Sequence, residues 1–170
     1  MNRCELVRCI EEVMESYIVD RIAGRITKAK RVFIVGNGGS ASVATHFACD
    51  LRNRAGIDAW SLTSNHAVIT AIANDAGYQF VFSDQIVEYC ERGDMVILFS
   101  VSGASPNTIL AANAARDKGV TVAAFVGKSF SSFENVIDLG LAIGTADFGV
   151  AETCFAAIAH HITDIVRGES

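Results

Sequence analysis

Short apolar runs alternate along this chain with segments whose apolar residues recur at helical spacing. The runs are rich in β-branched and aromatic residues, which favours buried strands. We expect strands at 32–35, 59–62, 95–99 and 120–126, with a weaker one at 136–143. We expect helices at 67–73, 80–90, 106–118 and 151–166, and one more directly after the first strand. Strands that alternate with helices predict a mostly parallel sheet covered on both faces, which is an α/β three-layer sandwich of the doubly wound kind.

The first segment, from Cys4 to Ile26, carries a helical apolar stripe with acidic residues between its members. The stripe comprises residues 6, 7, 10, 13, 14, 17, 18 and 22. We expect one helix here, within residues 1–29, followed by an α/β core at 30–170, and together they should form a single domain. The stripe could cover the sheet or pair with a partner subunit, and the pattern does not choose between the two.

Composition narrows the classes of function. Apolar residues make up 51% of the chain and the mean hydropathy is +0.33, which favours contacts between subunits. No apolar run approaches the roughly 20 residues that span a bilayer, and the acidic N-terminal segment does not resemble a signal peptide. The net charge of −5, without a basic stripe, argues against nucleic acid as a partner. Five scattered cysteines without C-x-x-C spacing are typical of buried, reduced thiols, so we expect a cytoplasmic protein.

The first strand runs into a glycine-rich turn, Gly36-Asn37-Gly38-Gly39, which is followed by Ser40-Ala41-Ser42. Glycine permits a positive φ and close approach of a ligand to the backbone. Ser40 and Ser42 are candidate N-caps of the next helix, whose free amides and partial positive charge suit a phosphate. No lysine follows the glycines, so the loop is not a P-loop. We therefore predict an anion site built from amides and hydroxyls.

A second small-residue loop, Ser100-Val101-Ser102-Gly103-Ala104-Ser105-Pro106, follows the strand at 95–99 and opens a helix whose first turn suits Pro106. In parallel sheets, ligands bind beyond the carboxyl ends of the strands, where the chain direction switches. We expect the two loops to meet there and to present several hydroxyls to one ligand.

Two helices carry residues that could hold a metal ion. His46 and Asp50 are four positions apart and face the same way, as half of a divalent-metal site or as a simple surface ion pair. Glu152 and His160 lie eight positions apart on the C-terminal helix, about 80° out of register. If the two helices converge over the glycine loop, two imidazoles and two carboxylates could surround one zinc-like ion.

Two other charged residues have simpler explanations when taken alone. Asp75 follows Asn74 where a helix is expected to end, so an Asx turn accounts for it. Arg54 lies downstream of Asp50 and is typical of a solvated side chain.

The order of these motifs resembles the sugar isomerase (SIS) domain proteins, and within them the phosphoheptose isomerases. The resemblance rests on Gly36-Asn37-Gly38-Gly39-Ser40, the run 46–51, Ala73-Asn74-Asp75, Gly93-Asp94 and Ser100-x-Ser102-Gly103-x-Ser105. It covers residues 30 to 166 approximately. It implies an isomerase that converts sedoheptulose 7-phosphate to D-glycero-D-manno-heptose 7-phosphate. It also implies a homotetramer with active sites lined by neighbouring subunits, and one zinc ion per subunit.

The resemblance also implies roles for individual residues. The phosphate would be held by Ser40, Ser100, Ser102 and Ser105 together with the Gly38–Gly39 backbone, and Asn37, Asp75 and Glu152 would lie near the sugar. The metal and catalytic positions fall on His46, Asp50, Glu152 and His160. Either Asp50 or His160 would be the base that moves a carbon-bound proton through an enediol, and the other would complete the shuttle.

Two alternatives remain open at this point. Some SIS proteins bind sugar phosphates without catalysis and act through a protein partner, as the replication-initiator-associated members do. The chain could also isomerise a different phosphosugar. His46, Asp50, Glu152 and His160 are all present, which favours an enzyme.

Overall fold

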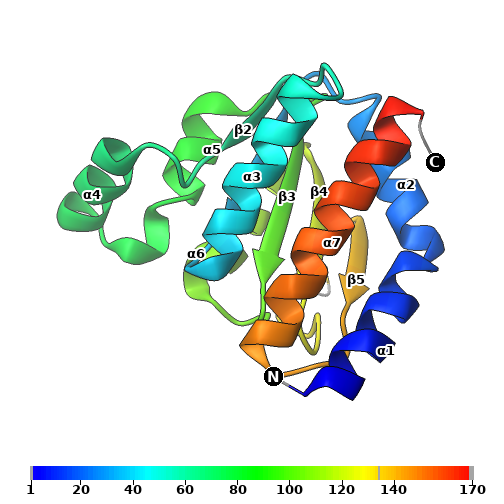
Figure 1. The fold of residues 1–170 in the computed structure, drawn as a ribbon. Coiled ribbons are helices and arrows are strands. Elements are labelled where there is room, and N and C mark those ends of the chain that lie inside the picture. The colour runs from blue at the N-terminus through cyan, green and yellow to red at the C-terminus, as the bar shows by residue number, and fades with distance from the viewer. Residues whose placement is uncertain (1, 134, 169–170) are drawn as a thin grey trace.

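The computed structural model describes residues 2–133 and 135–168, which are arranged around a five-stranded sheet (Figure 1). The strand order is β2-β1-β3-β4-β5, and all neighbouring strands are parallel. Their bounds are β1 Val32–Gly36, β2 Ala59–Ser61, β3 Met95–Ser100, β4 Thr121–Val126 and β5 Leu139–Ala142. The predicted α/β class with a parallel sheet between helical layers is confirmed.

The helices form two layers, one on each face of the sheet. One layer holds α1 (Arg3–Met14), α2 (Tyr17–Ile26), α3 (Gly39–Asn53) and α7 (Phe148–Arg167), which share one apolar core. The other holds α5 (Ser83–Tyr89) and α6 (Pro106–Asp117) over a second core, next to the short 3-10 helix η1 (Tyr78–Phe80). The helix α4 (His66–Asp75) projects away from the body of the molecule (Figure 1).

The N-terminal segment differs from the single helix that the apolar stripe predicted. It forms α1 and α2, because the backbone of Ser16 is extended and its carbonyl accepts from the amide of Val19 at 2.9 Å, which starts a new helix. The break shifts the buried face: Cys9, Val13, Val19, Ile22, Ala23 and Ile26 are buried. Two members of the predicted stripe, Val7 and Tyr17, are 49% and 67% exposed.

Two further helix boundaries correct the sequence analysis. Ser40 and Ser42 do not cap α3, since the helix begins at Gly39 and Gly38 is its N-cap with φ of 57°. Ser40 is therefore buried in the first turn. The helix expected at 80–90 begins only at Ser83, because η1 precedes it in place of a regular turn. By contrast, Pro106 occupies the first turn of α6 as predicted, with Ser105 as N-cap.

Aromatic packing holds α3 and α7 against the middle of the sheet. Phe99 of β3 stacks on Phe125 of β4, with ring centroids 5.2 Å apart. Phe155 of α7 lies 5.3 Å from Phe99, and Phe47 of α3 lies 6.3 Å from the same ring. Each such pair adds about 0.5–1.5 kcal/mol to the burial of its surface. The shared contact with Phe99 places α3 and α7 side by side, and Figure 1 shows them running in the same direction.

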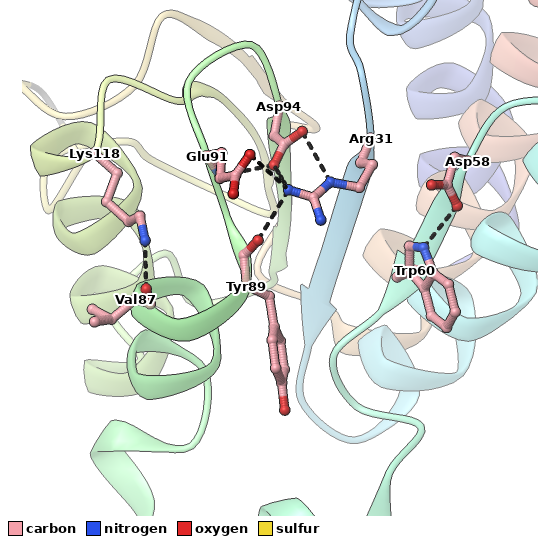
Figure 2. Close-up of polar contacts among 8 residues, drawn as sticks. All are labelled: Arg31, Asp58, Trp60, Val87, Tyr89, Glu91, Asp94 and Lys118. Atoms are coloured by element: carbon pink, nitrogen blue, oxygen red, sulfur yellow. Dashed lines mark hydrogen bonds and ion pairs between the residues drawn. The ribbon is translucent and has the colours of Figure 1, made fainter.

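An ion pair ties the amino ends of β1 and β3 together at the edge of the sheet opposite the glycine loop (Figure 2). Arg31 donates through Nε and Nη2 to both oxygens of Asp94, at 3.2 and 2.7 Å, and the Asp94 side chain is fully buried. Asp94 also accepts from the amide of Glu91 at 2.8 Å. The hydrogen bond with Asp94 raises the pKa of Arg31 above its usual value. The Gly93-Asp94 motif is thus a structural element in this fold.

The cysteines are all free thiols, as predicted, although two of the five are exposed. Cys9, Cys90 and Cys154 are buried, whereas Cys4 and Cys49 lie at the surface. Burial raises the pKa of Cys90 to about 12 and that of Cys154 to about 11. Among the described residues, the helices include none with the length and apolar character needed to cross a membrane.

Candidate active site

The two small-residue loops meet at the carboxyl edge of the sheet because they follow β1 and β3, which are adjacent parallel strands. The side chains of Asn37 and Asn107 join them through two reciprocal hydrogen bonds, in which each Nδ2 donates to the other residue's Oδ1 at 2.9 Å. Asn107 lies in the first turn of α6 and is buried. The predicted meeting of the loops is therefore present in the fold.

The loops and the start of α7 enclose a pocket of about 60 Å³. Its lining contains all four serines that were predicted to bind the phosphate, Ser40, Ser100, Ser102 and Ser105. The other lining residues are Asn37, Phe99, Val101, Phe148 and Glu152. Ser102 and Ser105 lie at the more exposed side, with their hydroxyl oxygens 3.4 Å apart. Among the described residues, the lining of this pocket includes no lysine or arginine, so an anion here would be held by hydroxyls and amides.

Ser100 is the most informative residue of the pocket. Its side chain is 4% exposed, and its Oγ has no hydrogen-bond partner within the described residues. A buried hydroxyl without a partner costs about 1–3 kcal/mol, so folds seldom keep one unless a ligand satisfies it. An oxygen of a bound phosphate would supply that partner.

Glu152 lies above the glycine turn at the start of α3. A Cβ atom built on Gly39 would come within 2.1 Å of Glu152 Oε2, so the absence of a side chain at residue 39 makes room for this carboxylate. The amino end of α3 carries partial positive charge, which stabilises a carboxylate placed there. Gly36 has a different constraint, since a Cβ would meet the backbone oxygen of Ser40 at 2.6 Å.

A second cluster lies further along the same two helices. His160 Nδ1 of α7 is 3.1 Å from Asp50 Oδ2 of α3, and His46 Nε2 is 3.6 Å from the same oxygen. The two imidazole rings meet edge to face, with centroids 5.1 Å apart. Among the described residues, these three form a group whose potential ligand atoms all lie within 4.8 Å of one another. The predicted convergence of residues 46 and 50 with residue 160 is present in the structure.

Glu152 is not a member of that group. It lies eight positions before His160, which corresponds to about 12 Å along the axis of α7. The four residues that the sequence analysis combined around one ion are therefore divided: three form the cluster, and Glu152 lines the serine pocket. Asp75 is exposed at the end of α4, where it accepts from Asn74 Nδ2 at 2.7 Å.

Charged groups around Asp50 fix its position. The side chain of Asp50 is 13% exposed, although the two histidines are 59% and 50% exposed. Arg54 approaches the carboxylate at 3.5 Å and is itself bound to Asp164 at 2.7 Å. Arg54 is exposed, as expected of a solvated side chain, and its two ion pairs also link the end of α3 to α7.

Sequence reasoning missed two residues next to Asn37. Asn107 bonds to it as described above, and the hydroxyl of Tyr78 donates to Asn37 Oδ1 at 2.9 Å. A possible signal for Asn107 was its place directly after Pro106, at the amino end of a helix that opens a ligand loop. No pattern in the sequence pointed to Tyr78, because its contact depends on how η1 folds back toward the first loop.

A parallel sheet with serine-rich loops at its carboxyl edge defines the SIS domain class, and the profile of the family described as "SIS domain" matches residues 11–127. The phosphoheptose isomerase of Roseiflexus sp. (strain RS-1) is 34% identical over 155 residues, which cover 88% of this chain and 79% of that protein. This chain belongs to the phosphoheptose isomerase family, so the predicted family is confirmed.

Solved structures also match the fold of this chain. The phosphoheptose isomerase from Neisseria gonorrhoeae matches with a TM-score of 0.89 and 26% identity, covering 97% of this chain and 94% of that one. The NanR protein of Vibrio vulnificus, solved in complex with ManNAc-6P, matches with a TM-score of 0.70 and 17% identity, covering 96% of this chain and 58% of that one. The second match shows a shared fold only.

Proposed function

We propose that this chain is an aldose–ketose isomerase that converts sedoheptulose 7-phosphate to D-glycero-D-manno-heptose 7-phosphate. Membership of the phosphoheptose isomerase family supports the reaction class and the substrate. The observation that carries the proposal is the arrangement of α3 and α7, which bear a serine pocket at one end and the His46, Asp50 and His160 cluster further along. Gly39 and His46 are about 10 Å apart along α3. That separation suits an extended sugar with a phosphate at one end and a carbonyl at the other.

In this proposal the phosphate enters the pocket lined by Ser40, Ser100, Ser102 and Ser105. The amides of Gly38 and Gly39 at the start of α3 contribute the positive end of the helix dipole. Because this site lies away from the reacting carbons, its binding energy serves to position C1 and C2 at the cluster. Asn37, Asp75 and Glu152 are proposed to contact the sugar between the two ends.

The cluster of His46, Asp50 and His160 fits a divalent ion. Two imidazole nitrogens and one carboxylate are the ligand types that zinc prefers, and three protein ligands leave a position open for substrate. We propose one zinc ion per subunit held by these three residues. Glu152, which the family resemblance implies as a further ligand, lines the serine pocket in this structure and would have to turn toward the cluster to reach the ion. Such an ion would polarise the carbonyl oxygen of the sugar and stabilise the negative charge of the enediolate.

The proton transfers are assigned to Asp50 and His160. The base removes a proton from C1 of the ketose, the C2 oxygen gains a proton and the O1 hydroxyl loses one, and the carbon-bound proton is returned at C2. His160 Nδ1 and Asp50 Oδ2 are 3.1 Å apart, and an atom of either group that does not hold the ion can carry the proton. Asp50 orients the imidazole, and either member of the pair can be the base.

We also propose a homotetramer with active sites near the subunit interfaces. None of the ten residues of α4 is buried against the rest of the described chain, although six of them are alanine, valine or isoleucine. The exposed side chains of Val7 and Tyr17 add apolar surface along α1 and α2. Neighbouring subunits would cover this surface. The free thiols support a reducing compartment, for which we propose the cytoplasm.

The test is to incubate the zinc-loaded protein with sedoheptulose 7-phosphate and to measure the aldose product. We expect turnover by the wild type and a fall of about 10²- to 10⁴-fold in kcat for His160→Ala. His161→Ala is the matched control, because it removes an imidazole from the adjacent position, outside the cluster. Absence of product, or an equal rate in His160→Ala and His161→Ala, would remove the proposal.

A second candidate function is sugar-phosphate binding without catalysis, in which the chain acts through a protein partner. The serine pocket is the observation in its favour, since its hydroxyl groups could hold a sugar phosphate without help from the histidines. The proximity of His46, Asp50 and His160 favours the enzyme, since a simple binding protein has no need of these groups. Retention of sedoheptulose 7-phosphate without turnover, together with a stable protein complex, would support the second candidate. Turnover of a different phosphosugar only would keep the chemistry and change the substrate.

A further inference from the structure

Three side chains form a closed hydrogen-bond network beside the serine pocket. Asn37 Oδ1 accepts from Asn107 Nδ2 at 2.9 Å and from the hydroxyl of Tyr78 at 2.9 Å. Asn37 Nδ2 in turn donates to Asn107 Oδ1 at 2.9 Å. The network links three separate segments: the glycine turn after β1, η1, and the first turn of α6.

The network limits what Asn37 can offer to a ligand. A carboxamide has two acceptor lone pairs and two N–H donors. Both lone pairs of Asn37 are used, and one N–H is used by Asn107, so one N–H of Asn37 is left within the described residues. Toward a ligand, Asn37 is therefore a donor.

Tyr78 has the complementary property. Its hydroxyl proton is directed at Asn37, which leaves the lone pairs of the phenolic oxygen as acceptors. The side chain is 55% exposed, so a ligand can reach it. The Tyr78 oxygen and the remaining N–H of Asn37 lie on opposite sides of the Asn37 carboxamide, because Asn107 occupies the edge between them, and both groups are uncharged.

The backbone of η1 holds Tyr78 in this place. Gly77 precedes it with φ of 115°, a conformation that side chains rarely adopt. The amide of Gly77 donates to the carbonyl of Ile72 at 3.0 Å, and the amide of Val81 donates to the carbonyl of Tyr78 at 3.4 Å. The turn thus holds the backbone at Tyr78 in place.

We propose that the Tyr78 hydroxyl accepts a hydrogen bond from one hydroxyl group of the sugar, on its phosphate-bearing half. A sugar hydroxyl can donate to this uncharged acceptor, and the remaining N–H of Asn37, on the other side of its carboxamide, is left to donate to a different oxygen of the sugar. Asn37 lines the same pocket as Ser100, Ser102 and Ser105, which places both groups nearer to the phosphate than to the His160 cluster. Tyr78 is then a specificity-determining residue. This inference rests on the proposed function and adds a contact to its site.

The experiment compares Tyr78→Phe with the wild type on sedoheptulose 7-phosphate and on the 5-deoxy and 6-deoxy analogues. Tyr89→Phe is the matched control, because Tyr89 is also exposed and, within the described chain, its hydroxyl makes no bond to Asn37. We expect kcat/KM for the full substrate to fall about three- to tenfold in Tyr78→Phe, the range for one neutral hydrogen bond. For one of the two analogues, wild type and Tyr78→Phe should be equal, since the hydroxyl is already missing. The inhibition constant of inorganic phosphate should be unchanged.

Two results would overturn the inference. One is Tyr78→Phe indistinguishable from Tyr89→Phe on the full substrate. The other is an equal loss on the full substrate and on both analogues, accompanied by weaker phosphate inhibition, which would mean that Tyr78 only supports the pocket. If the wild type shows no turnover, the proposed function fails, and the same comparison is made with dissociation constants from calorimetry. The proposed contact is then supported if Tyr78→Phe weakens the binding of sedoheptulose 7-phosphate but not that of one of the two deoxy analogues. It is overturned if all three ligands are affected equally or none is affected.

Discussion

The carboxylate of Asp50 and the imidazole of His160 lie 3.1 Å apart, although they belong to different helices. Their contact follows from the packing of α3 and α7 against Phe99, and it brings His46 into the same group. The serine pocket lies at the amino ends of the same two helices. The geometry of the whole candidate site thus depends on how this helix pair is seated on the sheet.

The metal proposal predicts a loss of zinc binding in His46→Ala. Removing one of three ligands should weaken zinc binding more than about tenfold, since even partners of ligands contribute that much. Zinc content after dialysis, measured by elemental analysis, checks this without any assay of activity. His66→Ala, which removes an exposed histidine at the start of α4, should keep the zinc content of the wild type. Equal zinc in both variants would contradict the assignment of the ligands.

Replacing Gly39 by Ala should reduce activity with little change in stability. The new methyl group would displace the carboxylate of Glu152, a flexible group, so the fold can accommodate it. Gly36→Ala should instead lower stability, because its Cβ would meet the backbone of Ser40 at 2.6 Å. Gly24→Ala in α2 is the control: nothing lies within 4 Å of its Cβ, and a helical alanine there should stabilise by up to about 1 kcal/mol. Chemical denaturation and steady-state kinetics separate the three cases.

Replacing Ser100 by Ala should separate stability from phosphate binding. The hydroxyl is buried without a partner in the described chain, so its removal should leave the free energy of unfolding equal to or above that of the wild type. Phosphate should bind about tenfold more weakly, because a hydrogen bond to a charged group is lost. Denaturation curves and calorimetric titration with inorganic phosphate measure the two quantities. A less stable protein with unchanged phosphate affinity would show that Ser100 has a structural role.

The buried thiols predict a loss of stability at alkaline pH. Burial raises the pKa of Cys90 to about 12, whereas a cysteine in the unfolded chain ionises near pH 8.5. Above that pH the unfolded state loses a proton that the folded state keeps, so the stabilising contribution declines until the pH reaches the folded pKa. The slope per thiol is at most about 1.4 kcal/mol per pH unit.

Comparison of variants isolates this effect from the other groups that titrate at high pH. The free energy of unfolding of Cys90→Ala should fall less steeply between pH 9 and pH 11 than that of the wild type, whatever its value at neutral pH. Cys4→Ala, which removes an exposed thiol, should keep the slope of the wild type. Parallel curves for all three proteins would contradict the prediction.

The sequence predicted the parts of this structure that depend on local pattern. Apolar runs gave the strands, and the order of glycine and serine loops gave the edge at which they meet. The sequence pattern was less informative about where helices begin and end. The apolar stripe at 6–22 did not reveal the break at Ser16, and Ser40 was read as a cap although Gly38 takes that place.

Within the candidate site, spacing along a helix predicted which side of the helix a residue lies on. It did not predict which residues of the two helices lie at the same height along their axes. His46 and Asp50 were correctly paired with His160, since all three lie near one level of α3 and α7. Glu152 was grouped with them because it shares a helix, yet it lies two turns away beside Gly39. Tyr78 and Arg54 gained their partners through tertiary packing, which no local pattern encodes.

The central claim is that this chain moves a proton between two carbons of a sugar phosphate. The most direct test is to incubate the zinc-loaded wild type with sedoheptulose 7-phosphate in D₂O and to follow the products by NMR. We predict formation of D-glycero-D-manno-heptose 7-phosphate carrying deuterium at C2, because a base that holds the proton can exchange it with solvent. No aldose at all, or aldose entirely without deuterium at C2, would contradict the account.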